Sequence, residues 1–92
     1  MNKGELIAKV SEETGLTQKQ VESVVSTLLE SIVGQITKGE KVTIAGFGTF
    51  EKRHRKARTG RNPQTGAEMQ IAASDVPAFS AGKQFKESVK AG

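Results

Sequence analysis

The first part of the chain has the apolar spacing of an amphipathic helix. Asn2, followed three residues later by Glu5, is a typical helix N-cap, so we expect this helix to begin at Lys3. Gly15 is a typical C-cap and predicts its end. The apolar stripe consists of Leu6, Ile7 and Val10.

A second, longer helix is predicted next. Thr17 and Gln20 repeat the capping-box pattern at its start, and the helix is expected to end before Gly39. Its apolar residues keep the i, i+3, i+4, i+7 spacing without a break. They are Val21, Val24, Val25, Leu28, Leu29, Ile32, Val33 and Ile36. So small a chain has little to cover this stripe, and exposed apolar surface costs about 25 cal/mol per Å². We therefore expect a two-fold homodimer with interlocked cores rather than a monomer folded over its own sheet.

The pattern then changes to that of a small antiparallel sheet. Residues 41–44 and the segment from residue 49 are predicted strands, joined by a tight turn in which Phe47 is packed inward. Phe50 and, further along, Phe79 are expected to join the dimer core. The predicted fold is α+β, with a helical body and this sheet.

Beyond Phe50 the second strand loses its apolar face. From Lys52 onward neither side of it is apolar, so this part cannot pack on the body. Residues 60–66 form a predicted turn, and residues 67–76 a returning strand, which together make a β-ribbon arm. Pro77 is expected to stop the ribbon, and Ser80 to cap a last short helix.

Composition adds a strong charge asymmetry to this picture. The chain has 92 residues, which is enough for one domain, and a formal net charge of +4. Residues 1–46 have a net charge of −1, whereas residues 47–92 have a net charge of +5. A near-neutral half joined to a basic half suggests a folded body with a polyanion-binding surface. The N-terminus has no long apolar run, so we expect a cytoplasmic protein without a membrane span.

Catalytic and metal-binding patterns are weak throughout the chain. There is no cysteine, and the single histidine, His54, lies among cations, which makes it a poor base or metal ligand. The segment from Ser80 to Lys83 matches S-x-x-K, but no partner motif accompanies it. We therefore expect no enzyme activity, no cofactor, no metal and no small-molecule substrate.

The basic stretch from Lys52 to Arg61 has six Lys or Arg in ten residues and no acidic residue. Many charge runs are merely solvated surface, but the excess of arginine favours phosphate and minor-groove contacts. The chain has no Trp or Tyr, and the core requires its four Phe, so no platform for stacking single-stranded bases exists. These features favour double-stranded DNA. Pro63 is explained equally well as a turn former or as a wedge between base pairs.

Four stretches resemble the HU and integration host factor family of bacterial histone-like DNA-binding proteins. They are MNKGELI, GEKVTIAGFGTFEKRHRKAR, GRNPQTG and VPAFSAGKQFKESV, and the resemblance runs nearly end to end. It implies an intertwined homodimer, with residues 1–51 and 75–92 as the dimerisation body and residues 52–74 as an arm that embraces DNA.

The resemblance also implies a function and a set of site residues. It implies bending and wrapping of DNA through the minor groove with little sequence specificity, for nucleoid compaction, with a preference for bent, nicked or distorted duplexes. An integration host factor-like subunit that prefers particular sequences is the alternative. Pro63 would be the wedge. The other implied DNA contacts are Lys3, Arg53, Arg55, Arg58, Arg61, Asn62, Lys83 and Lys86.

Two rivals from other classes remain at this point. An anionic-membrane binder would carry a basic amphipathic helix, whereas the basic segment here is a strand without an apolar face. A purely structural homodimer with a basic arm would have no nucleic-acid ligand at all.

Overall fold

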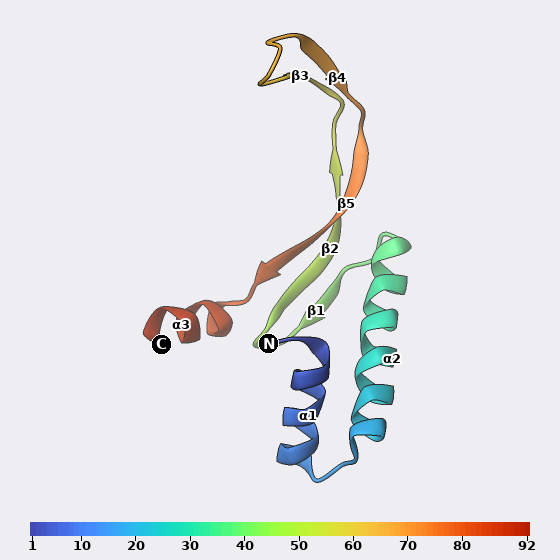
Figure 1. Cartoon of the computed structure of the whole chain (residues 1–92), viewed down its shortest axis with the longest axis vertical. Coiled ribbons are helices and arrows are strands. Elements are labelled where there is room, and N and C mark those ends of the chain that lie inside the picture. The colour runs from blue at the N-terminus through green and yellow to red at the C-terminus, as the bar shows by residue number, and fades with distance from the viewer. The chain divides into compact units, whose positions relative to one another are not determined.

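The computed structural model describes residues 1–92 and has an α+β fold, as the sequence predicts (Figure 1). Three helices and five strands follow one another along the chain. In order they are α1 (Lys3–Thr14), α2 (Gln18–Thr37), β1 (Val42–Ile44), β2 (Gly48–Arg55), β3 (Arg58–Arg61), β4 (Glu68–Ile71), β5 (Ser74–Ala81) and α3 (Lys83–Ala91). They form two compact units, residues 1–34 and residues 35–92.

The first unit is a helical hairpin whose ends are fixed by the predicted caps. The Asn2 side-chain oxygen accepts a hydrogen bond from the Glu5 N–H (2.8 Å), and Gly15 ends α1 with φ of 75°. Thr17 and Gln20 form a reciprocal capping box, with backbone-to-side-chain hydrogen bonds of 3.0 and 3.1 Å. Local sequence therefore determines where both helices begin.

The apolar core of a single chain is thin. Ile7 and Val21 are its only buried hydrophobic residues. On the predicted stripe of α2, Leu28 and Leu29 are 52% and 47% exposed. Val25, Ile32 and Ile36 are only half-buried. One copy of the chain thus leaves most of the expected dimer core in contact with water.

In the second unit, β2 is the central strand of a three-stranded antiparallel sheet in the order β1-β2-β5. The short β1 pairs with β2 only from Gly48 to Phe50, whereas β5 pairs with β2 along its whole length as far as Arg55. Beyond Phe50 the sheet is therefore a two-stranded ribbon. After a break in pairing, β3 and β4 continue it as a second two-stranded ladder (Figure 1).

Four phenylalanines form the apolar cluster of this unit. Phe50 and Phe79 lie opposite each other in the β2–β5 ladder, with ring centroids 4.7 Å apart, and Phe47 lies 5.2 Å from Phe85 of α3. Gly48 permits this packing, because a Cβ there would lie 2.6 Å from the Phe79 ring and 2.5 Å from a backbone oxygen. Phe50 is half-buried in this cluster. Phe47 and Phe79 join the cluster but remain 42% and 41% exposed.

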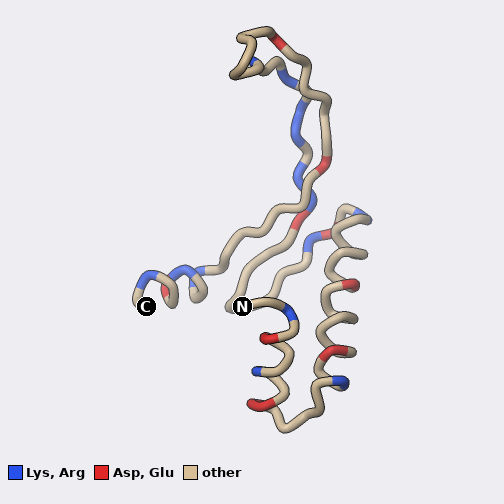
Figure 2. The backbone as a smooth tube through the Cα atoms, viewed as in Figure 1, with Lys and Arg blue, Asp and Glu red and all other residues tan.

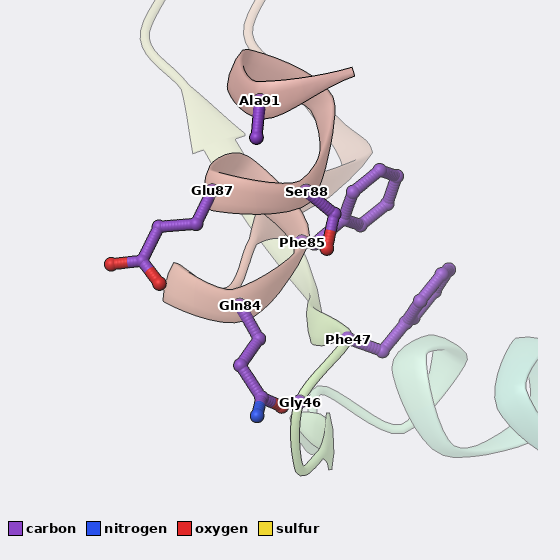
Figure 3. Close-up of a pocket in the computed structure, with 7 residues that line it drawn as sticks. All are labelled: Gly46, Phe47, Gln84, Phe85, Glu87, Ser88 and Ala91. Carbon is purple, nitrogen blue, oxygen red and sulfur yellow. The ribbon is translucent and has the colours of Figure 1, made fainter.

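An open pocket lies beside this cluster, between the β1–β2 turn and α3 (Figure 3). The Phe47 and Phe85 rings lie on one side of the pocket. On another side, the Gln84 side chain reaches toward Gly46. No residue of the unit fills this space, so the cluster has an uncovered flank.

Two predictions about the C-terminal segment are wrong. Pro77 does not stop the ribbon but lies within β5 opposite Lys52, and Ser80 lies in the same strand opposite Thr49. A proline is tolerated there because β5 is an edge strand, which need not donate every ladder hydrogen bond. The N-cap of α3 is Gly82, which has no capping side chain.

Candidate nucleic-acid interface

Positive charge is concentrated on one strand of the ribbon. The outgoing segment, residues 52–61, contains six Lys or Arg, whereas the returning segment, residues 62–82, contains none (Figure 2). The returning segment contributes two carboxylates, Glu68 and Asp75. The arm therefore pairs a segment rich in cations with a returning segment that has no cation and two carboxylates.

The cations nearest the sheet are paired with carboxylates. The Arg53 guanidinium contacts Glu51 at 2.9 Å, and the Lys41 ammonium lies 3.5 Å from the same carboxylate. Lys52 lies 3.7 Å from Asp75 on the returning strand. These pairs neutralise part of the charge at the base of the arm.

The pKa values of both carboxyl groups respond to these contacts. The hydrogen bond from Arg53, together with the charge of Lys41, holds the pKa of Glu51 below its usual value. A 2.8 Å hydrogen bond with the His54 ring, assisted by the charge of Lys52, lowers the pKa of Asp75. Both groups are therefore ionised at neutral pH and available as partners for the nearby cations.

The cations nearer the tip have no carboxylate partner. Arg55 ends β2, Lys56 lies in the break between the ladders, and Arg58 and Arg61 lie in β3. All four are exposed. The predicted site residues Arg55 and Arg58 thus present unneutralised guanidinium groups along the outgoing segment, which suits bidentate contact with phosphate. Arg61 lies opposite Glu68 in the β3–β4 ladder but forms no ion pair with it.

The tip of the arm is a tight turn that satisfies its own polar groups. The Asn62 N–H donates to the Ala67 oxygen at 2.9 Å, and the Gly66 N–H, with φ of 71° at Gly66, donates to the Asn62 oxygen at 2.7 Å. The Asn62 side chain also accepts from the Gln64 N–H at 2.9 Å. Asn62 therefore holds the turn together, and Pro63 next to it remains exposed.

A second basic surface lies on α3, which follows β5 at the opposite end of the ladder from the tip (Figure 2). Lys83 and Lys86 are exposed there and line an open groove together with Glu87 and Lys90. Lys90 was not among the predicted contacts. It follows Lys86 by four residues, and Lys86 follows Lys83 by three, so all three lysines lie on the same helix face.

Lys3, the remaining predicted contact, lies in the other unit at the start of α1. Its ammonium group donates a hydrogen bond to the Ser26 hydroxyl at 3.1 Å.

The chain contains no group of His, Cys, Asp or Glu residues arranged to hold a metal ion. None of its helices combines the length and the apolar character that crossing a bilayer requires.

Comparison with known proteins identifies the family. A family model described as bacterial DNA-binding protein matches residues 1–90. The DNA-binding protein HU of Streptococcus downei is 61% identical over 89 residues, which are 97% of this chain and 98% of that protein. The chain belongs to the HU family of bacterial DNA-binding proteins. Membership of this family agrees with the prediction that the chain is not an enzyme.

Solved structures of HU proteins have the same fold. The Anabaena HU–DNA cocrystal structure matches with a TM-score of 0.89 and 54% identity, covering 97% of both chains. HU from Thermotoga maritima matches with a TM-score of 0.69 and 36% identity, covering 97% of this chain and 98% of that one. These HU proteins thus share the α+β fold of this chain.

Proposed function

We propose that this protein is a histone-like architectural protein that binds double-stranded DNA through the minor groove with little sequence specificity. It bends, wraps and stabilises DNA and so compacts the nucleoid of the bacterial cytoplasm. The observation that carries this proposal is the row of unpaired arginines leading along the arm to an exposed proline. Its support is membership of the HU family and similarity to the Anabaena HU–DNA complex.

The functional unit that we propose is an intertwined homodimer. The apolar stripe of α2 is about half exposed in one chain, and the phenylalanine cluster has an uncovered flank beside the pocket of Figure 3. A second copy that covers both would remove this surface from water, at about 25 cal/mol per Å². Residues 1–51 and 75–92 would form the body of the dimer, and residues 52–74 its two arms.

The proposed contacts with DNA divide into three groups. Cations of the arm lie against the groove and its phosphates, Asn62 and Pro63 form the tip, and cations of the body hold flanking DNA. The arm cations are Arg53, Arg55, Arg58 and Arg61, and the body cations are Lys3, Lys83 and Lys86. Little sequence preference follows, because the minor groove presents a degenerate pattern of donors and acceptors.

Pro63 is the proposed wedge. Because the hydrogen bonds of Asn62 hold the turn, the proline ring is free to insert between base pairs. Unstacking one step of intact DNA costs on the order of a few kcal/mol, and this cost is smaller where a nick or mismatch has already broken the stack. The protein should therefore prefer distorted duplexes.

The test compares binding to intact, nicked and sequence-varied duplexes at several salt concentrations, with bending measured by energy transfer between the duplex ends. Pro63→Ala should reduce bending and the preference for the nicked duplex. Gln64→Ala is the matched control, because its backbone hydrogen bond to Asn62 survives the substitution. Full bending by Pro63→Ala would contradict the wedge, and strong selection among intact sequences would instead favour a site-preferring protein.

A further inference from the structure

The amino-acid composition makes methionine the most oxidisable side chain of this protein. The chain contains no Cys, Trp or Tyr and only two Met. Met1 lies at the N-terminus, and Met69 lies in β4 of the arm. Peroxides convert an accessible thioether to the sulfoxide, and no thiol is present here to react first.

Met69 occupies an open position on the ribbon. It is 48% exposed and lies opposite Gly60 in the β3–β4 ladder, so the facing residue has no side chain to cover it. The space over Gly60 is taken partly by Ile71, since a Cβ at Gly60 would lie 2.9 Å from the Ile71 Cδ1 atom. Met69 and Ile71 therefore form an apolar strip beside Gly60.

The two faces of the ribbon tip differ in character. Side chains alternate along a strand, and residues paired across the ladder share a face, so Met69, Ile71 and Arg58 lie on one face. On the other face, Gln70 is hydrogen-bonded to Thr59 at 3.3 Å, and Glu68 lies directly opposite Arg61. The Met69 face combines an apolar strip with the Arg58 guanidinium and has no carboxylate in this ladder, so it is suited to lie against the sugars that line a DNA groove.

We propose that Met69 is an oxidation site that weakens the grip of the arm on DNA, an inference that rests on the proposed function. A sulfur lone pair attacks one peroxide oxygen, the O–O bond breaks, and a sulfur–oxygen bond forms. The proton on the transferred oxygen passes to the departing hydroxide, so the sulfur is oxidised by two electrons to the sulfoxide and the second peroxide oxygen leaves as water.

Oxidation of Met69 makes the contact between this side chain and the DNA groove less favourable. The sulfoxide oxygen is a hydrogen-bond acceptor without a donor, and the floor of the minor groove at A·T pairs presents only acceptors. Placing this oxygen against sugars and base edges removes it from water without a replacement partner. We expect the affinity for duplex DNA to fall about tenfold, which corresponds to the loss of one contact of this kind.

The experiment uses hydrogen peroxide on the intact protein, with peptide mass spectrometry to follow both methionines and DNA binding measured on the same samples. Affinity should fall in proportion to sulfoxide at Met69 and return after treatment with methionine sulfoxide reductases. Met69→Leu is compared with its own untreated sample and should show no response to peroxide. It still carries Met1, so any effect of oxidation at the N-terminus would persist in it.

The outcomes separate this inference from the proposed function. Untreated protein that fails to bind DNA would refute the proposed function itself. Untreated protein that binds, but keeps its affinity when Met69 is fully oxidised, would overturn the inference alone. A loss of affinity that Met69→Leu shares would assign the effect to Met1 and also overturn it.

Discussion

Lys52 and Arg55 lie three residues apart in β2, yet the structure predicts that they contribute differently to DNA binding. Lys52 lies 3.7 Å from Asp75 and donates a hydrogen bond to the Thr37 oxygen at 3.3 Å, so its charge is already engaged. Arg55 is exposed and has no carboxylate partner. We expect phosphate to meet Arg55 directly, whereas it must compete with Asp75 for Lys52.

The size of this difference in DNA binding can be worked out from counterion release. Each phosphate neutralised contributes about −0.9 to the slope of the logarithm of the binding constant against the logarithm of salt concentration. In a dimer with two arms, Arg55→Gln should therefore make the slope shallower by about 1.8. The double variant Lys52→Gln/Asp75→Asn removes an internally neutral pair and should leave the slope nearly unchanged.

Fluorescence anisotropy of a labelled duplex between about 50 and 200 mM salt measures both slopes, and circular dichroism checks that each variant keeps its fold. A double variant that flattens the slope as much as Arg55→Gln would show that Lys52 leaves Asp75 to bind phosphate. The division between paired and unpaired cations would then be wrong.

Four further predictions concern stability. The thermal midpoint should rise with protein concentration, because dissociation of the dimer is coupled to unfolding, and a midpoint that ignores dilution would argue against the dimer. Gly48→Ala should lower the free energy of unfolding by about 1–3 kcal/mol, because its Cβ would meet the Ser80 backbone. Gly34→Ala, at an open helix position, should raise it by up to about 1 kcal/mol, and urea titrations of the two variants check both signs. Because the folded-state pKa values of Glu51 and Asp75 are lowered, their stabilisation is present above the unfolded-state pKa and is lost as the pH falls through the lower folded value. Glu51→Gln should therefore lower the thermal midpoint near neutral pH but not at a pH below the folded-state pKa of Glu51, and an equal effect under both conditions would contradict this.

Features set by neighbouring residues could be predicted from the sequence. The caps at Asn2, Gly15 and Thr17 each depend on groups within a few residues, and all three are present in the structure. The change of β2 from apolar to basic after Phe50 also follows from local spacing. The α+β class and the ribbon arm were accordingly predictable.

Features set by partners distant in sequence were not predictable. The place of Pro77 inside β5 depends on which strand lies at the sheet edge, and the Gly82 cap depends on how far β5 stays paired with β2. The pairing of Lys52 with Asp75 joins residues 23 positions apart. A one-residue change of register would move Asp75 to the other face of the ribbon and leave Lys52 free.

The charge of the arm is thus graded along its length by the cross-strand register. Near the sheet, carboxylates at Glu51 and Asp75 neutralise their neighbours. Arg55 and Arg58 have no carboxylate opposite them, whereas Arg61 lies opposite Glu68 without forming an ion pair. Phosphate should therefore bind more strongly at Arg55 and Arg58 than at Lys52 and Arg53. Because these two arginines lie between the neutralised base of the arm and the exposed Pro63, the strongest electrostatic attraction acts in the part of the arm that leads to the proposed wedge.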